Sequence, residues 1–255
     1  HVGRVHAAPD GVMQDSTDDR KLSTPSGPLT DLALTLPIFL GYHLGVIFLP
    51  VRNAADVVTR ELVNLADRSL TTYAALTLCI GGLYVAVLML LGRGRALHWE
   101  RFLSIAVVGV VYAIAMRLIA NWVSSRLVLA QGGELAVSLA DHDAFSGLVM
   151  ALGAGFYEEL AFRVGLYGVG GRLFTLTFPS LVPFSRLLKL LAWGLFSAAA
   201  FSAWHHLGAM GEPFDLRVFI FRMVAGLVFT LIYALRGFAP AVWTHALYDL
   251  WVLVL

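Results

Sequence analysis

Charged side chains and cysteines are both scarce in this chain. Only 14% of the 255 residues are charged, against about 25% in soluble domains, and 58% are hydrophobic, with a mean hydropathy of +0.77. The single cysteine, Cys79, excludes a disulfide framework within the chain and disfavours a zinc site built from thiolates. The formal net charge is +1 and no basic stripe is present, so no nucleic-acid partner is expected. This balance indicates a protein whose solvent is lipid.

The first residues differ from the rest. Residues 1–30 are polar and rich in Pro, Gly, Ser and Asp, with no apolar stretch before a signal-peptide cleavage site. Such a composition cannot form a core, so a disordered tail is expected there. Residues 31–255 are expected to form a helical membrane domain.

Several stretches are long and apolar enough to be membrane-spanning helices, which need about 20 mainly apolar residues. They are Leu32–Pro50, Thr71–Leu91, Phe102–Val123, Phe145–Gly168, Leu187–Ala209, Phe214–Leu235 and Pro240–Leu255. The sequence therefore predicts an all-α, polytopic transmembrane helical bundle of about seven spans. Arginines concentrate after the second, fourth and sixth spans, which favours a cytoplasmic N-terminus.

Two connections have a pattern of their own. Between the first two spans, Val58, Leu62 and Leu65 fall at helical spacing among charged residues, which predicts an amphipathic helix at the membrane interface. Val169–Ser185 contains two glycines and two prolines. Because these residues interrupt helices, a loop or a re-entrant connection is expected there.

Adjacent carboxylates lie inside the fourth predicted span. An ionisable side chain costs at least ~2.5–3.5 kcal/mol at the centre of a membrane helix, so Glu158 and Glu159 need a physical reason. Glu159 precedes Arg163 by four residues, the spacing of an ion pair on one helix face. Glu158, about 100° further round an α-helix, is then available for another role. The alternative is that both glutamates only join a buried charge network with Arg163, Arg117 or Arg222.

Imidazoles occur in two later spans. His205 ends a polar cluster in the fifth span, and its neighbour His206 is interpreted as structural or as reaching the interface. In the last span, His245 and Asp249 are four residues apart and project from one face. Such a pair fixes an imidazole tautomer, binds a metal, donates toward an oxyanion, or only stabilises a helix.

Rows of small residues accompany these groups. One row has four-residue spacing (Gly147, Ala151 and Gly155), and another runs over residues 197–200 just before the histidine cluster. Small side chains allow helix backbones to approach closely. We therefore expect tight packing around the helices that carry the carboxylates and the imidazoles.

Taken in order, three motifs resemble those of the CPBP family. They are Glu158-Glu159-x-x-x-Arg163, Phe201-x-x-x-His205 and His245-x-x-x-Asp249, all in apolar spans. The family includes the type II CAAX prenyl endopeptidases, the bacterial Abi-type membrane proteases, proteins implicated in bacteriocin self-immunity and the myxosortases. The resemblance implies a catalytic core at about residues 145–255. It also implies a metal-independent protease of the bacterial inner membrane and a substrate with a C-terminal processing signal.

The resemblance also implies a role for each residue. Glu158 would activate water, His205 would bind and orient it, and His245 with the residue at position 249 would stabilise the oxyanion. Glu159 and Arg163 would hold the site together. The prenyl endopeptidases usually have Asn at position 249, and an ionised Asp cannot donate a hydrogen bond. Asp249 is therefore either protonated or orients His245, and the four-residue spacing favours the second reading.

Four functions remain open at this stage. They are a metal-free intramembrane endopeptidase, a variant with zinc between Glu158, His205 and His245, a non-catalytic immunity or scaffold protein that binds a peptide, and a transporter or proton relay. The last is disfavoured because no inverted repeat is evident. One difficulty concerns the spans themselves. If every span simply crosses the membrane, His205 lies near the outer surface and His245 near the inner surface. A shared site therefore requires a tilted helix, a broken helix or a misplaced boundary after Gly168.

Overall fold

The structure is a computed structural model that describes residues 28–49, 53–66, 69–91, 100–127, 143–177, 186–207 and 211–255. Within these ranges all regular elements are helices, which confirms the predicted all-α class. In chain order they are α2 (Pro28–Gly45), η1 (Val46–Phe48), α3 (Val57–Leu65), α4 (Leu70–Leu91), α5 (Glu100–Leu127), α6 (Ala144–Gly153), η2 (Ala154–Glu158), η3 (Leu160–Gly170), α7 (Gly171–Thr177), α8 (Arg186–Trp204), α9 (Leu216–Arg236) and α10 (Phe238–Val254). Most of the expected polar tail lies outside the described residues.

Each predicted span overlaps a helix, and the span Phe145–Gly168 overlaps the three consecutive elements α6, η2 and η3. Among the residues that the structure describes, three helices are long and apolar enough to cross a membrane, over Thr30–Phe48, Glu100–Leu127 and Leu216–Arg236. Shorter apolar helices cover Leu70–Ala86 and Leu190–Trp204. The number of spans that cross the membrane stays a prediction.

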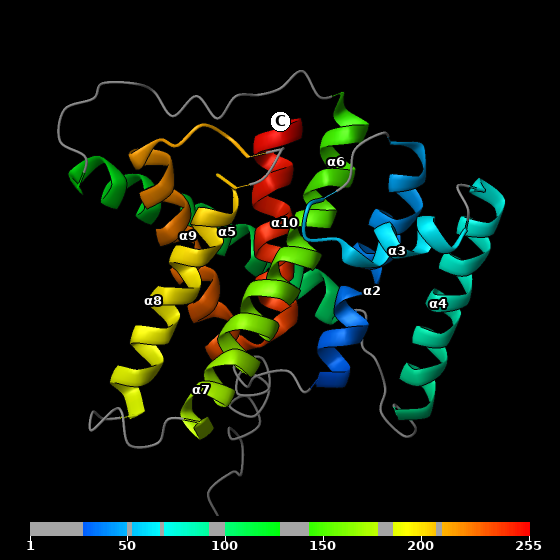
Figure 1. The fold of residues 1–255 in the computed structure, drawn as a ribbon, viewed down its shortest axis with the longest axis horizontal. Coiled ribbons are helices and arrows are strands. Elements are labelled where there is room, and N and C mark those ends of the chain that lie inside the picture. Colours follow the sequence, from blue (N-terminus) through cyan, green and yellow to red (C-terminus); the bar gives the residue numbers. More distant parts are fainter. Residues whose placement is uncertain are drawn as a thin grey trace, which may run out of the picture.

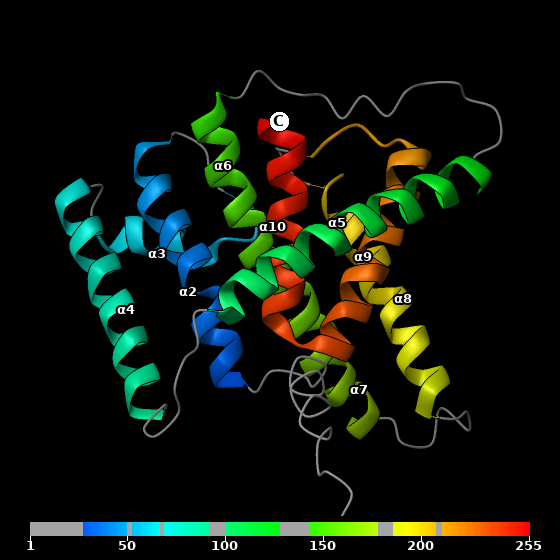
Figure 2. The ribbon, with the colours of Figure 1, turned by 180° about the vertical axis from the view of Figure 1, so that it is seen from behind.

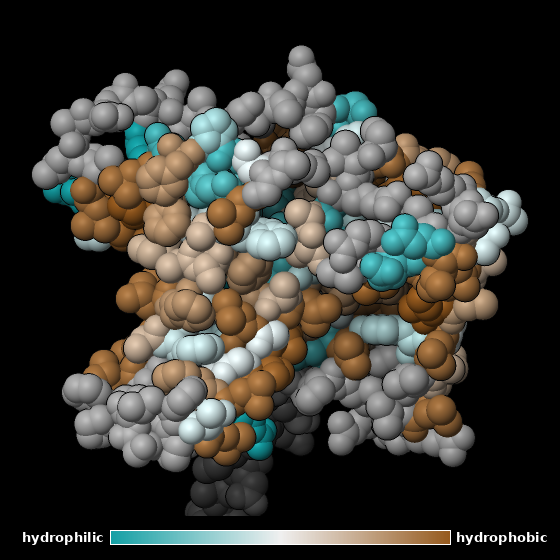
Figure 3. Space-filling view, in the orientation of Figure 1, coloured by the Kyte–Doolittle hydropathy of each residue, from teal (hydrophilic) through white to brown (hydrophobic). Residues whose placement is uncertain are grey.

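The outer surface of the helices is apolar. On α5, Val107, Leu118 and Trp122 are each more than half exposed. Figure 3 shows hydrophobic residues over much of the described surface on one face. A helix that is apolar on its outward side as well as its inward side is suited to lipid rather than to water, as the sequence composition predicts.

Helix α10 lies at the centre of the bundle. It packs against α5, α6, α9 and α2, and α5 crosses it obliquely, behind it in Figure 1 and in front of it in Figure 2. A Cβ atom on Gly155 would lie 2.6 Å from the Cβ of Ala246, and one on Gly147 would lie 2.6 Å from the carbonyl oxygen of Leu253. The first row of small residues therefore permits close contact with α10, as predicted.

The second row of small residues, on α8, also permits a neighbouring helix to approach closely. A Cβ atom on Gly226 would lie 3.2 Å from the Cα of Ala198, so α8 and α9 approach closely there. The hydroxyl of Ser197 donates to the carbonyl oxygen of Phe162 at 3.0 Å. Both predicted close contacts are confirmed.

The N-terminus of α10 is capped by a side chain from the first helix. The carboxylate of Asp31 accepts hydrogen bonds from the backbone nitrogens of Phe238 (3.0 Å) and Ala239 (3.3 Å), which have no partner inside their own helix. Gly237 adopts a φ of 99°, a conformation that glycine reaches without steric penalty. The sharp turn between α9 and α10 and the Asp31 cap together fix where α10 starts.

The segment expected to be a loop or a re-entrant connection is partly helical instead. The helix continues to Gly170 and then through α7 to Thr177, so the prediction is wrong for residues 169–177; residues 178–185 lie outside the described ranges. The glycines serve packing here. A Cβ atom on Gly171 would lie 2.7 Å from Cδ1 of Trp193, so glycine lets α8 approach this helix.

The predicted helix between the first two spans is confirmed as α3. It begins at the cap residue Asp56, whose side chain accepts from the backbone nitrogen of Thr59 at 2.8 Å. Leu62 is buried whereas Leu65 is exposed. A position at the membrane interface stays a prediction.

Candidate active site

The two glutamates lie where the helix changes its hydrogen bonding. The sequence predicts an ordinary α-helix over this span, but after α6 the hydrogen bonds of η2 and η3 are of the wider π type. Departures from α-helical hydrogen bonding of this kind are frequent at functional sites. Glu158 and Glu159 are both buried, as is Arg163.

Glu159 and Arg163 form the predicted ion pair. Oε2 of Glu159 lies 3.1 Å from Nε of Arg163, and both side chains are almost fully buried. The guanidinium also donates to the carbonyl oxygen of Gly226 at 3.4 Å. Its carbon lies 4.4 Å from the ring centre of Phe201 and 5.1 Å from that of Phe229. The buried cation is therefore held by a carboxylate, a carbonyl and two aromatic faces.

The alternative charge network around Glu158 is not what the structure contains. Arg222 pairs with Glu212 at 2.8 Å, and Arg117 lies over the ring of Trp251 at 4.2 Å. Arg163 pairs with Glu159 instead. An ion pair with arginine therefore accounts for one buried glutamate and not for the other.

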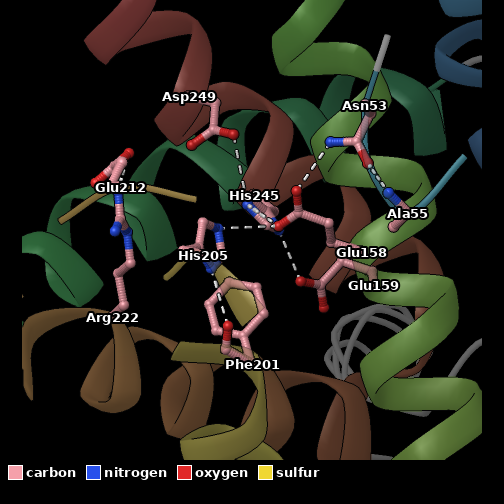
Figure 4. A network of polar contacts seen from close by, with 10 residues as sticks. All are labelled: Asn53, Ala55, Glu158, Glu159, Phe201, His205, Glu212, Arg222, His245 and Asp249. Carbon is pink, nitrogen blue, oxygen red and sulfur yellow. Dashed lines mark hydrogen bonds and ion pairs between the residues drawn. The ribbon is translucent and has the colours of Figure 1, made fainter. Parts of the chain in front are cut away.

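The two oxygens of Glu158 face different partners (Figure 4). Oε1 accepts a 2.9 Å hydrogen bond from Nδ2 of Asn53. Oε2 lies 3.5 Å from Nε2 of His205 and 4.0 Å from Nε2 of His245. These two distances exceed the usual hydrogen-bond length of about 2.7–3.2 Å. Oε2 of Glu158 thus lies next to two imidazoles without a close bond to either.

His205 lies in the turn directly after α8. Its Nδ1 is 2.9 Å from the carbonyl oxygen of Phe201. A carbonyl oxygen only accepts, so Nδ1 carries a proton and donates, and Nε2 is the nitrogen that faces Glu158. The side chain is 23% exposed, whereas that of Glu158 is only 9% exposed.

The structure also resolves the difficulty over helix ends. Helix α8, which directly precedes His205, ends at Trp204, five residues before the predicted Ala209. In Figure 1, α8 lies lower than α10, so its carboxyl end is level with the middle of α10, where His245 lies. An early helix end and a vertical offset therefore bring the two histidines to one carboxylate.

The imidazole of His245 is held on several sides. Its Nδ1 lies 2.7 Å from Oε1 of Glu159, and its ring stacks on that of Phe229 with 4.6 Å between centres and 16° between planes. Oδ2 of Asp249 lies 3.5 Å from Nε2, so the predicted shared face is present. The shortest polar contact of the ring is nevertheless the one with Glu159, and the orienting role of Asp249 stays a prediction.

A comparison with known families matches the region that contains this site. Residues 140–251, somewhat less than half of the chain, match the family model described as type II CAAX prenyl endopeptidase Rce1-like. This part of the chain is similar to that family. The match is consistent with the resemblance to the CPBP family and contains all six predicted site residues. Comparison with curated proteins and with solved structures gave no match.

The match bears on the class of protein. It supports a CAAX-type intramembrane endopeptidase, which is a hydrolase. Together with the apolar helices, it shows an integral membrane protein. Among the described residues, no group of three or more His, Cys, Asp or Glu side chains is arranged to hold a metal ion. Independence from metal stays a prediction.

Sequence reasoning missed a site residue outside the matched region. Asn53, in the segment between η1 and α3, donates to Glu158 although 105 residues separate them. The only local signal was the cap pattern at Asp56 and Thr59, which marks the start of α3. That pattern predicts a helix end and carries no information about a contact with the CAAX-endopeptidase-like region.

Proposed function

We propose that this chain is a glutamate-dependent intramembrane endopeptidase that cuts near the C-terminus of a protein or peptide substrate. The observation that supports it best is the geometry of Glu158. One of its oxygens is occupied by Asn53, and the other lies beside the Nε2 atoms of His205 and His245. A carboxylate with one oxygen directed between two imidazoles is suited to hold and deprotonate a water molecule.

The proposed reaction needs no protein nucleophile. Water donates one hydrogen bond to Oε2 of Glu158 and another to Nε2 of His205, whose proton lies on Nδ1. As the water oxygen bonds to the substrate carbonyl carbon, its proton passes to Glu158. When the C–N bond breaks, Glu158 gives this proton to the leaving amine, so protons balance over the cycle.

The oxyanion would be stabilised by His245. Nδ1 of His245 donates a hydrogen bond to Glu159. When Nε2 carries a proton as well, it can donate a hydrogen bond to the developing negative charge. Asp249 lies 3.5 Å from that Nε2 and favours a proton there by its charge. Glu159, which is paired with Arg163, holds the ring of His245 through Nδ1, so these two residues need not touch the substrate.

The substrate and the setting are parts of the same proposal. We infer a protein or peptide with a C-terminal processing signal, cut within a multi-pass protein of the bacterial cytoplasmic membrane whose N-terminus faces the cytoplasm. Lipid surrounds the apolar helices, and no nucleic acid is involved.

We propose that no metal takes part. Metal analysis of the purified protein, with activity measured after a chelator, tests this: lost activity restored by zinc would contradict it.

The deciding experiment removes the base. Purified protein is incubated with a farnesylated peptide that ends in a CAAX sequence, and Glu158→Ala and Glu158→Gln are compared with wild type. Both variants should remain folded, as judged by gel filtration and Tm, and lose cleavage by at least about 10³-fold. Glu212→Gln changes a carboxylate that is 54% exposed and serves as the matched control.

The same variants separate this proposal from the alternative, a non-catalytic immunity or scaffold protein that binds a peptide at this place. Substantial cleavage by Glu158→Ala would sink the mechanism. If the wild type cuts nothing while Glu158→Ala still protects cells or supports assembly, the alternative holds.

A further inference from the structure

A second buried polar cluster adjoins the site on the side of α2 and α3. It links the two residue pairs Tyr42–Asp56 and His43–Tyr157. The hydroxyl of Tyr42 donates to Oδ2 of Asp56 at 2.7 Å, and Nε2 of His43 lies 2.6 Å from the hydroxyl of Tyr157. Tyr157 directly precedes Glu158. This cluster therefore fastens the N-terminal part of the chain to the helix that carries the proposed base.

Asn53 is held in this cluster by its backbone. Its backbone nitrogen donates to the hydroxyl of Tyr42 at 3.3 Å, and its carbonyl oxygen accepts from the backbone nitrogen of Asp56 at 3.1 Å. Asp56 in turn caps α3 through Thr59. The position of Asn53 is thus set by α2 on one side and by the start of α3 on the other, and the residue is buried.

The orientation of the Asn53 amide follows from its neighbours. Its Oδ1 lies 2.9 Å from the backbone nitrogen of Ala55. A backbone N–H only donates, so the atom facing it must be the amide oxygen, and the amide nitrogen must be the atom that points to Glu158. Nδ2 then donates to Oε1 of Glu158 at 2.9 Å, as Figure 4 shows.

The geometry points to Asn53 as a positioning residue for Glu158: its amide binds one carboxylate oxygen and thereby directs the other at His205 and His245. This inference rests on the proposed function. A carboxylate held at one oxygen cannot rotate about its terminal bond without losing that hydrogen bond. The reacting oxygen is thus placed before substrate arrives, and misplacement by about 1 Å can cost about 10²-fold in rate.

The kinetic test uses the farnesylated CAAX peptide with the full chain. Asn53→Ala should lower kcat about 10- to 100-fold and leave KM within about twofold, because the donor acts on the transition state and not on peptide binding. Asn53→Asp should lower kcat further, since an ionised carboxylate cannot donate and repels Glu158. Asn64→Ala, which changes an exposed asparagine of α3, should leave both constants unchanged.

A stability test separates this contact from the activity. Asn53→Asp should lower Tm, and adding Glu158→Gln should restore most of the loss, because the glutamine amide can then donate to the new carboxylate. Activity stays absent in the double variant. If Tm is not restored, or if Asn53→Ala keeps wild-type kcat, the inference is overturned. If Tm is restored but the wild type does not cut the peptide, the contact stands and the proposed function fails.

Discussion

Glu159 is shared between a buried imidazole and a buried guanidinium: its Oε1 accepts a 2.7 Å hydrogen bond from Nδ1 of His245, and its Oε2 lies 3.1 Å from Nε of Arg163. None of the three side chains is more than 5% exposed. One carboxylate therefore joins η3 to α10 and determines which nitrogen of His245 faces Glu158. Its loss affects both the fold and the chemistry.

Glu159→Gln is expected to lower the free energy of unfolding by about 3–5 kcal/mol, because Arg163 is left as a buried cation without its counter-ion. Chemical unfolding of the purified protein in detergent measures this change. Glu212→Gln breaks the partly exposed pair with Arg222 and should change stability by about 1 kcal/mol or less. Equal effects of the two substitutions would contradict the assigned role of the buried pair.

The two adjacent histidines provide a matched pair of variants. His205→Ala should lower kcat by about 10²–10⁴-fold, because its Nε2 lies 3.5 Å from Oε2 of Glu158 and is the group proposed to bind the water. His206 turns the other way, with its Nδ1 3.2 Å from the carbonyl oxygen of Glu212 and its ring against Phe214. His206→Ala should therefore stay within about tenfold of wild type. A larger loss for His206→Ala than for His205→Ala would exchange the roles given to them.

Local patterns were sufficient to predict the helices and those contacts of the site that lie within a single helix. Apolar stretches located every helix that carries a site residue, and four-residue spacing placed Glu159 with Arg163 and His245 with Asp249 on shared faces. These interactions lie within one helix turn, where sequence distance fixes spatial distance. The close approach of α10 also followed from the spacing of small residues such as Gly155.

Contacts between distant segments could not be predicted in this way. Nothing in the local sequence around Asn53 indicates a partner 105 residues away, and nothing around Glu159 indicates that its second oxygen reaches His245. The glycines after Gly168 also led to a wrong prediction. Gly171 looks like a loop residue in the sequence, but its lack of a side chain makes room for Trp193 within a helical pair.

Asp249 stands where the prenyl endopeptidases usually have Asn, and its variants test what the carboxylate contributes. Because Glu159 already orients the ring of His245 through Nδ1, Asp249 is not needed for that hydrogen bond. Asp249→Asn keeps the size of the side chain and can donate, so kcat should stay within about tenfold of wild type. Asp249→Ala removes the polar group 3.5 Å from Nε2 and should cost about 10²-fold.

Cleavage of the farnesylated CAAX peptide by both variants, measured as kcat, tests what the Asp249 carboxylate contributes. Tm is the control for folding. If Asp249→Asn loses as much activity as Asp249→Ala, the negative charge itself is required. In that case the charge of Asp249, which favours a proton on Nε2 of His245, is what the site needs, and an amide donor at this position cannot replace it.

The contact between Gly155 and Ala246 should control both stability and activity. A Cβ atom on Gly155 would lie 2.8 Å from the backbone nitrogen of Ala246, and a backbone cannot move as a flexible side chain can. Gly155→Ala is therefore expected to lower the free energy of unfolding by about 1–3 kcal/mol. It should also lower kcat, because it pushes the helix with Glu158 away from the helix with His245.

Gly82→Ala provides the control within α4. A Cβ atom there meets nothing within 4 Å, so the substitution should leave kcat unchanged and raise stability by about 0.5–1 kcal/mol, the usual gain of alanine over glycine in a helix. Parallel unfolding curves and cleavage rates for the two variants measure the difference. Wild-type stability and kcat in Gly155→Ala would show that these two helices can separate without disturbing the site, which the 2.6 Å approach to the Cβ of Ala246 argues against.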